Sequence, residues 1–503
     1  MLGKFFDRSL TVVEKVGNKL PSPSLLFGIL ALITLAGSYL VSVLDWNAVN
    51  PVDNKIIHGV NLLNYEGIHR ILKEMVTNMT GFAPLGVVLV SMLGIGIAEK
   101  SGLINSGIKL LVVYSPKKIL TFVLVFAGIL SNMASDVGYV VLIPLAGVIF
   151  ASVGRNPIVG MAAAFAGVSG GFSANLFLGT IDPLLAGLTE EGARIMDPSY
   201  VVNPAANYYF MFVSTFVIGI AGTVVTEKIV APKLESSADY ASEKVEKLNA
   251  DEKRGMGYAV VSFFVMAAII LIGVLPEGGF LRGKDGSILH SPLIESVVVF
   301  ILFISAIMGI AYGYGSKTFK NSSDIVKGMD DSMKSLGSYL TLVFFAAQFV
   351  AFFKWSNIGV LTAINGANLL KSLDLGLIPL VILFVIFSAV VNLVIGSASA
   401  KWAILAPVFV PIFMLMGYSP ELSQAVYRVG DSVSNIISPM MSYFALIITF
   451  FHKYDPKAGL GTIISTMLPY SIAFFVIWTA LLIVWILIGL PLGPGAGLYY
   501  QQN

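Results

Sequence analysis

The stretch YRVGDSVSNIISPMM, from Tyr427 to Met441, places two charged residues between long apolar segments. A charged side chain in the middle of a membrane costs at least roughly 2.5 kcal/mol. Arg428 and Asp431 are three residues apart, which places them on one helix face, where we expect them to pair. Such a pair lowers the cost of burying both charges. It can either stabilise the helix alone or form part of a binding site.

The composition is that of an integral membrane protein. Of the 503 residues, 56% are hydrophobic and only 12% are charged, with a mean hydropathy of +0.85. Soluble domains carry about 25% charged residues. The chain is therefore predicted to be an all-α polytopic membrane protein. It has no cysteine, which excludes disulfides and thiolate metal sites, and its net charge of +2 is no indication of nucleic acid as a partner.

Apolar runs predict nine crossing helices and two further segments that fit no simple crossing. The helices are expected at about 22–44, 82–100, 157–184, 207–231, 257–275, 293–314, 338–355, 420–451 and 462–491. The segments at about 119–151 and 375–416 are too long for one helix of about 20 residues. Each has a polar centre, SNMASD at 131–136 and NLVIGSASAKW at 392–402. We interpret both as re-entrant hairpins, with two tight crossings each as the alternative.

The distribution of basic residues sets the expected orientation. With the N-terminus inside, the inner segments hold 21 Lys and Arg and the outer segments hold 8, as the positive-inside rule requires. Residues 1–21 are then expected to be a retained cytoplasmic segment. The charged stretch 233–254 is expected to be a cytoplasmic linker between a first half at 22–232 and a second half at 255–503.

The two halves share a pattern of prolines. Pro144 in the first hairpin and Pro157 at the next helix are 13 residues apart, as are Pro407 and Pro420 in the second half. Each later helix is then interrupted by a Gly, Ser and Asn run that ends in another proline, at Pro183 and Pro439. Paired broken helices in inverted halves indicate a transporter site near the bilayer midplane. Close helix packing through small residues is the alternative explanation.

Charged residues near these breaks are the first candidates for chemistry. Asp431 could bind a coupling cation or proton, while the arginine fork of Arg428 suits a carboxylate. Asp182 precedes the proline that ends the first break, where it could cap a helix or take part in the site. Asp136 at the first hairpin tip could likewise be a cap or an ion ligand. Lys401 could contact an anion or extend toward the membrane surface.

Hydroxyl and amide side chains form the second group of candidates. Their oxygens, together with unwound backbone carbonyls, suit a hard cation such as Na⁺. A Na⁺ ion is considered possible at Asn132, Asn392 and Asp431, with Asn435 and Ser432 as further ion-coupling residues. The full group is Ser131, Asn132, Ser135, Ser173, Asn175, Thr180, Asn392, Ser397, Ser399, Ser432, Ser434, Asn435 and Ser438.

Trp402 lies near the second hairpin tip, where its ring could stack on an aromatic ligand; an interfacial position is the alternative. No other cofactor is indicated. The four histidines are scattered without metal-ligand spacing, and no nucleophile with a base is found at membrane depth. An enzyme or a channel is therefore less expected than a carrier.

The chain resembles the AbgT family, the p-aminobenzoyl-glutamate transporters of the ion transporter superfamily, over essentially its whole length. The motifs that carry the resemblance are SNMASDVGYVVLIPL (131–145), AGVSGGFSANLFLGTIDPLLAG (166–187), NLVIGSASAKWAILAPVFVPIF (392–413) and YRVGDSVSNIISPMM (427–441). The resemblance implies a homodimer in the bacterial inner membrane, with an inner transport core and an outer scaffold in each protomer. It also implies functional roles for Asp182, Asn392, Ser399, Trp402, Arg428, Asp431 and Pro439.

The expected function follows from this site and this resemblance together. The chain is expected to carry p-aminobenzoyl-glutamate or related folate-type aromatic carboxylates, driven by a Na⁺ or proton gradient, in an elevator-like cycle. The first alternative is a proton-driven efflux pump for sulfonamides and p-aminobenzoate-type antimetabolites. A Na⁺-coupled dicarboxylate carrier is a further alternative.

Overall fold

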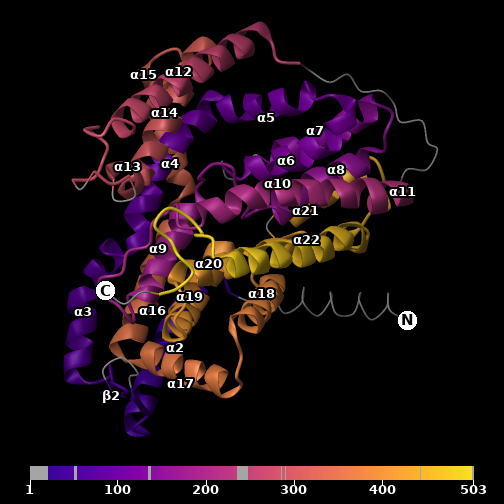
Figure 1. The fold of residues 1–503 in the computed structure, drawn as a ribbon. Coiled ribbons are helices and arrows are strands. Elements are labelled where there is room, and N and C mark those ends of the chain that lie inside the picture. The colour runs from indigo at the N-terminus through magenta and orange to yellow at the C-terminus, as the bar shows by residue number, and fades with distance from the viewer. Residues whose placement is uncertain are drawn as a thin grey trace.

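The computed structural model describes residues 21–49, 54–133, 138–234, 247–284, 286–288, 291–441 and 443–500. Helices dominate this part of the chain (Figure 1). The first half comprises α2 (Pro23–Val43), β1 (Asn47–Val49), β2 (Ile56–His58), α3 (Tyr65–Thr80), α4 (Ala83–Ser101), α5 (Leu103–Val113), η1 (Lys117–Ile119), α6 (Leu120–Ser131), η2 (Gly138–Leu142), α7 (Ile143–Ser152), α8 (Pro157–Phe165), η3 (Ala166–Gly170), α9 (Ile181–Ala193), α10 (Tyr208–Val225), η4 (Thr226–Val230) and α11 (Ala231–Leu234).

The second half is also helical. It comprises α12 (Ala250–Val274), α13 (Pro292–Glu295), α14 (Val297–Gly315), α15 (Ser322–Ser335), α16 (Gly337–Trp355), α17 (Ile358–Ser372), α18 (Leu377–Val394), α19 (Ala398–Leu415), α20 (Pro420–Asn435), α21 (Phe444–His452) and α22 (Leu460–Ile488). The short strands β1 and β2 pair antiparallel. The all-α membrane fold predicted from composition is confirmed.

Nine helical segments of the described chain are long and apolar enough to cross a membrane. Seven of them coincide with predicted crossings, and the other two are α18 and α19, the arms of the second predicted hairpin. The two remaining predicted crossings, 157–184 and 420–451, are not single helices because both are broken. The number of helices therefore agrees with the predicted number of crossings, but two of the nine helices are not among the predicted crossings.

Both helices are broken as predicted, but the second break begins later than expected, because Gly430–Asn435 still belong to α20 and only the residues after Asn435 leave the helix. The first follows α8 and the π-helix η3, after which residues 171–180 form no helix until α9 begins at Ile181. The second separates α20 from α21, and Pro439 lies in it. Proline lacks the amide hydrogen that a continuing helix needs, and glycine costs backbone entropy within a helix.

The two predicted hairpins also take the form of paired helices. In the first, α6 and α7 flank a tip of which residues 134–137, including Ser135 and Asp136, lie outside the described residues. In the second, α18 and α19 flank a non-helical tip at 395–397. The Ser397 side chain caps α19 by accepting from the Ala400 amide at 3.4 Å. A serine at this position satisfies one of the open amides of the first helical turn.

Sequence periodicity gave no sign of the short helices α3, α5, α15 and α17 between the crossings. Charged and polar residues interrupt α3 and α15, so a search for apolar runs passes over them. The predicted cytoplasmic segment 1–21 and most of the linker 233–254 lie outside the described residues. The division into two halves at this linker stays a prediction.

The helices form two groups, and α9 contacts both of them. In the peripheral group, α4 packs along α14 and α15, α12 along α14, and α16 along α2. In the central group, α20 packs on α18, α19 and α22, and α6 packs on α8, η3 and α10. α9 contacts α4, α19 and α20, and both α9 and α20 lie near the middle of the molecule in Figure 1. The two broken helices are therefore brought together where the groups meet.

Gly430 allows α20 to pack tightly against α18. A Cβ atom at this position would lie 2.4 Å from the Val385 carbonyl oxygen and 2.7 Å from the Ser388 Cβ. Gly430→Ala should therefore separate the two helices and destabilise the protein by about 1–3 kcal/mol, the usual cost of overpacking. Thermal unfolding in detergent measures the effect, with Gly461→Ala as the matched control because nothing lies within 4 Å of that position. Equal melting temperatures for the two variants would contradict the close crossing.

Candidate functional site

The two charges of the opening motif do not pair with each other. Arg428 Nη2 donates to Asp182 Oδ1 at 2.6 Å, whereas Asp431 pairs with Lys401. All four side chains are almost completely buried. The expected pairing of Arg428 with Asp431 is therefore wrong. α20 is enclosed on several sides, by α9, α18, α19 and α22, so each charge finds a partner from a different segment.

Asp182 combines a helix-end role with an ion pair. Its Oδ2 accepts from the Gly179 amide at 2.7 Å, which secures the start of α9, while its Oδ1 accepts from Arg428. The same Arg428 nitrogen also lies 3.3 Å from the Ser173 carbonyl oxygen. Asp182 is therefore placed as the predicted helix-end cap, and its pair with Arg428 joins the first break to α20; a part for Asp182 in the site stays a prediction.

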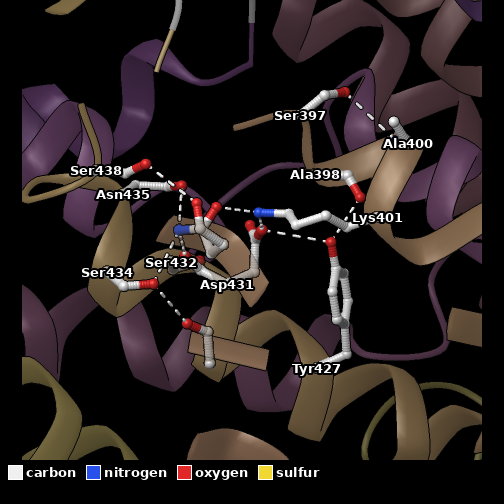
Figure 2. Close-up of polar contacts among 12 residues, drawn as sticks. Ser397, Ala398, Ala400, Lys401, Tyr427, Asp431, Ser432, Ser434, Asn435 and Ser438 are labelled. Carbon is white, nitrogen blue, oxygen red and sulfur yellow. Dashed lines mark hydrogen bonds and ion pairs between the residues drawn. The ribbon is translucent and has the colours of Figure 1, made fainter. Parts of the chain in front are cut away.

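Lys401, which the sequence left without a role, lies in the second charged pair. Its ammonium group contacts both Asp431 Oδ1 and Asn392 Oδ1, and the side chain is fully buried (Figure 2). Extension toward the membrane surface is therefore wrong for this lysine. The Tyr427 hydroxyl donates to the Ala398 carbonyl at 2.5 Å and lies 3.3 Å from Asp431 Oδ1. The start of α19 and the middle of α20 are thus joined through one polar cluster.

Asn392 organises the oxygen-rich side of this cluster. Its amide nitrogen lies 2.8 Å from each of three acceptors, the Asp431 carbonyl, Ser434 Oγ and Asn435 Oδ1. The Ser438 hydroxyl donates to the backbone carbonyl oxygen of Asn392 at 3.0 Å. The end of α18 is thereby attached to the end of α20 and to the break that follows.

The first half repeats this arrangement. The Asn132 amide donates to the Val168 carbonyl of η3 at 3.0 Å, as Asn392 donates to the Asp431 carbonyl. In both halves the asparagine at a hairpin tip bonds the backbone of the following broken helix. Asn435 joins the two arrangements, since its amide lies 3.4 Å from the carbonyl of Ser169, the neighbour of Val168.

The predicted Na⁺ ligands divide between these arrangements. Asn392 and Asp431 lie together with Asn435, but both Asn392 Oδ1 and Asp431 Oδ1 already face the Lys401 ammonium. Asn132 bonds backbone carbonyls of the first half instead. Ser432 Oγ accepts from the Ser173 amide at 3.1 Å. A Na⁺ ion at the three named residues stays a prediction, and it would have to compete with a lysine for two of them.

Several buried polar atoms at the crossing of the two breaks have no protein partner in the described structure. They are Ser173 Oγ, Asn175 Nδ2 and Oδ1, Arg428 Nε and Asp431 Oδ2. Buried polar groups are nearly always hydrogen-bonded, and leaving one unsatisfied costs about 1–3 kcal/mol. These donors and acceptors are available to a polar ligand that enters between α20 and the first break.

A cavity of about 740 Å³ lies between the peripheral group and residues of the two hairpins and the first break. Asn132, Thr180 and Ser399 line it together with residues of α4, α9, α15 and α16. At its rim Lys100 pairs with Asp331 at 2.7 Å, and this hydrogen bond lowers the pKa of the Asp331 carboxyl. Two predicted site residues, Asn132 and Ser399, therefore face a space large enough for a drug-sized ligand.

Trp402 does not line that cavity. It is fully buried, its ring stacks on Tyr427 with centroids 4.4 Å apart, and its Nε1 donates to Thr189 Oγ1 at 2.8 Å. A ligand ring could take the place of Tyr427 only if the tyrosine moved. In this arrangement Trp402 positions the tyrosine whose hydroxyl reaches the Lys401–Asp431 pair.

Trp402→Ala should therefore lower both stability and transport, because it leaves a cavity beside Tyr427; truncation of a buried tryptophan costs about 3–5 kcal/mol. Trp402→Phe retains a ring against Tyr427 and should keep more activity. Thermal unfolding and substrate affinity measured on both variants test this. If Trp402→Phe lost affinity as fully as Trp402→Ala while remaining stable, direct contact with the ligand would be favoured instead.

Three partners at the site were not predicted. Tyr427 stands in the opening motif four residues before Asp431, a spacing that shares a helix face and could have indicated it. Thr189 and its acceptor Gln424, 2.6 Å away, carry no such local signal because they lie 235 residues apart.

The predicted site residue Pro439 lies in the second break and is partly buried.

Comparison with known proteins gives consistent results over the whole chain. A family model described as "AbgT putative transporter family" matches residues 8–500. The p-aminobenzoyl-glutamate transport protein of Escherichia coli K12 is 37% identical over 485 residues, which cover 96% of this chain and 95% of that protein.

Two solved structures have the same fold. The YdaH transporter of Alcanivorax borkumensis, described as having an unusual topology, matches with a TM-score of 0.91 at 46% identity, covering 94% of this chain and 100% of that one. MtrF of Neisseria gonorrhoeae, described as illuminating a class of antimetabolite efflux pumps, matches with a TM-score of 0.91 at 50% identity, covering 97% and 99%.

Proposed function

Because this chain belongs to the AbgT family of transporters, we propose that it carries p-aminobenzoyl-glutamate or a related folate-type aromatic carboxylate, driven by an ion gradient. The name of the E. coli relative supports this substrate class. The observation that carries the proposal is the site itself. Two buried ion pairs stand where two broken helices cross, beside a cavity of about 740 Å³.

The roles of the residues follow from their contacts. Arg428 retains an Nε–H without a partner and is the donor proposed to meet a carboxylate of the substrate, with Asp182 holding the guanidinium in place. Ser399 and Asn132 line the entry from the cavity. Asn392 bonds the Asp431 carbonyl, Ser432 accepts from the Ser173 amide, and Asn435 lies against the Ser169 carbonyl. They hold the backbone near Asp431, which is the proposed coupling residue. Trp402 supports the site through Tyr427, and Pro439 keeps the second break open.

We further propose an elevator-like movement of the central group against the peripheral group. The cavity lies between these two groups, with lining residues from both, so a relative movement would change its access. The proposed setting is a homodimer in a bacterial inner membrane. The 21 to 8 distribution of basic residues supports a cytoplasmic N-terminus. A transporter of this family needs no catalytic role for its side chains.

Uptake into proteoliposomes tests the function. Radiolabelled p-aminobenzoyl-glutamate is supplied outside vesicles that carry either a Na⁺ gradient or a proton gradient. Accumulation above equilibrium with one gradient would support the proposal and identify the ion. Flux that does not saturate with substrate and does not respond to a gradient would contradict a carrier.

A second candidate is proton-driven efflux of sulfonamides or p-aminobenzoate-type antimetabolites. It is favoured by the 50% identity to MtrF, whose description concerns antimetabolite efflux pumps. In the same vesicles, proton-driven movement of a sulfonamide without accumulation of p-aminobenzoyl-glutamate would favour this candidate.

A further inference from the structure

We propose that Tyr139 and Phe172 form the subsite that holds the aromatic ring of the ligand, and that they make the carrier selective for aromatic over saturated acyl groups. This inference rests on the proposed function, because it names the part of the protein that recognises the aromatic half of a folate-type ligand. It gives the ring a place that Trp402 lacks, since that tryptophan is fully buried and covered by Tyr427.

The two side chains line the cavity of about 740 Å³ from two segments of the first half. Tyr139 lies in η2, on the return arm of the first hairpin, and Phe172 lies in the first break. The polar residues Asn132, Thr180 and Ser399 line the same cavity. Aromatic surface combined with a few hydroxyl and amide groups is the lining typical of a small-molecule site.

The Tyr139 ring is held in a fixed plane by Tyr443. The two rings are stacked, with centroids 4.7 Å apart and planes inclined by 10°. Because Tyr443 covers one face of Tyr139, the part of the Tyr139 ring that lines the cavity is its other face or its edge. Both suit a further aromatic ring, since offset-stacked and edge-to-face pairs are the favoured arrangements. A ring that is already held in place also loses little freedom when a ligand binds.

Phe172 connects this ring position to the charged part of the site. The carbonyl of its neighbour Ser173 accepts from Arg428 Nη2 at 3.3 Å, and the Ser173 amide donates to Ser432 Oγ at 3.1 Å. Ser173 Oγ and Arg428 Nε are buried donors without a protein partner in the described structure. Successive residues are about 3.8 Å apart, which is within the length of an aminobenzoyl-glutamate molecule. A ligand ring against Phe172 therefore leaves the carboxylates of the same ligand within reach of these donors.

A third aromatic residue of the cavity, Tyr339, belongs to the peripheral group. It lies on α16, and its hydroxyl donates to the Pro84 carbonyl of α4 at 3.1 Å. Tyr139 and Phe172 belong to the central group instead, because η2 packs on α6, α7 and α8 and the neighbour of Phe172 is bonded to α20. In the proposed elevator-like movement, a ring held by Tyr139 and Phe172 travels together with Arg428.

The experiment measures equilibrium binding to the purified full chain in detergent by isothermal titration calorimetry. The probes are N-benzoyl-glutamate and N-cyclohexanecarbonyl-glutamate, which differ only in whether the ring is aromatic or saturated. The wild type should bind the benzoyl compound on the order of tenfold more tightly, because aromatic pairs contribute beyond the area that they bury. Phe172→Leu should lower this preference by about threefold or more, and Phe172→Leu combined with Tyr139→Leu should abolish it. Phe172→Tyr keeps a ring and should retain the preference.

Phe177→Leu is the matched control. Phe177 lies in the same break as Phe172, but it lines a separate apolar cavity of about 400 Å³ between α4, α5, α12 and α14. The control should keep the preference of the wild type. Thermal unfolding shows whether each variant is folded during the titration. If loss of the stack on Tyr443 prevents Tyr139→Leu from folding, the comparison of Phe172→Leu with Phe172→Tyr still decides.

Two results would overturn the subsite. One is an unchanged preference in the folded leucine variants, and the other is a wild type that binds the two probes equally or binds neither. The proposed function is tested separately by titration with p-aminobenzoyl-glutamate. If that compound does not bind but p-aminobenzoate does, the proposed substrate fails, and benzoate and cyclohexanecarboxylate replace the two probes in the same comparison. If p-aminobenzoyl-glutamate binds without any preference for an aromatic ring, the function stands and the subsite fails.

Discussion

Asp182→Ala should destabilise the protein by about 3–5 kcal/mol, the cost of removing one partner from a buried ion pair. The Arg428 side chain is only 1% exposed, so its guanidinium would lose its counter-ion without gaining water. Transport should be lost as well, because the pair joins the first break to α20. Chemical or thermal unfolding in detergent measures the first effect, and uptake into vesicles measures the second.

A surface pair is the appropriate control. Glu74 pairs with Arg70 at 3.1 Å with both side chains more than 40% exposed, and Glu74→Ala should cost no more than about 1 kcal/mol. The double variant Asp182→Leu with Arg428→Met removes both charges and should be more stable than Asp182→Ala alone. A stability of Asp182→Ala equal to that of Glu74→Ala would show that the buried pair is not required for folding.

Asp431→Asn should abolish gradient-driven accumulation while leaving exchange of substrate across the membrane measurable. The asparagine preserves the shape of the side chain but cannot form an ion pair with Lys401 or release a proton at physiological pH. Accumulation under an imposed gradient and counterflow without a gradient are compared in the same vesicles. Asp374→Asn, at an exposed position after α17, is the control and should retain both activities.

Either of two results would count against Asp431 as the coupling residue. Normal accumulation by Asp431→Asn would remove it from the coupling step altogether. Loss of counterflow together with loss of folded protein would instead assign it a structural role, which the thermal unfolding of the same preparation would reveal.

Much of the fold was predictable because it depends on local properties of the chain. Long apolar runs predicted seven of the crossing helices, since a membrane imposes length and hydropathy on each span separately. The break at 171–180 and the one that follows Asn435 were indicated by Gly, Ser and Pro, which disfavour helix, although Gly430 and the serines after it remain in α20. Equal proline spacing indicated an internal repeat, which stays a prediction. The amphipathic helices between the crossings were missed because their patterns are short and partly polar.

The candidate residues were also recognisable one at a time. Arg428 and Asp431 could be recognised because a charge in an apolar region is costly whatever its partner is. Lys401 fulfilled the same criterion but could not be assigned, since a lysine side chain is long enough either to reach water or to pair inside.

By itself, the sequence determined that this is a helical membrane protein with two broken helices, and which polar residues lie near the breaks. Only the tertiary structure decided how those residues pair. Arg428 bonds Asp182, 246 positions away, and Asp431 bonds Lys401 rather than the arginine three residues before it. The reason is that pairing depends on which elements pack around α20, and in a buried site with several charges the shortest separation along the chain need not give the best contact.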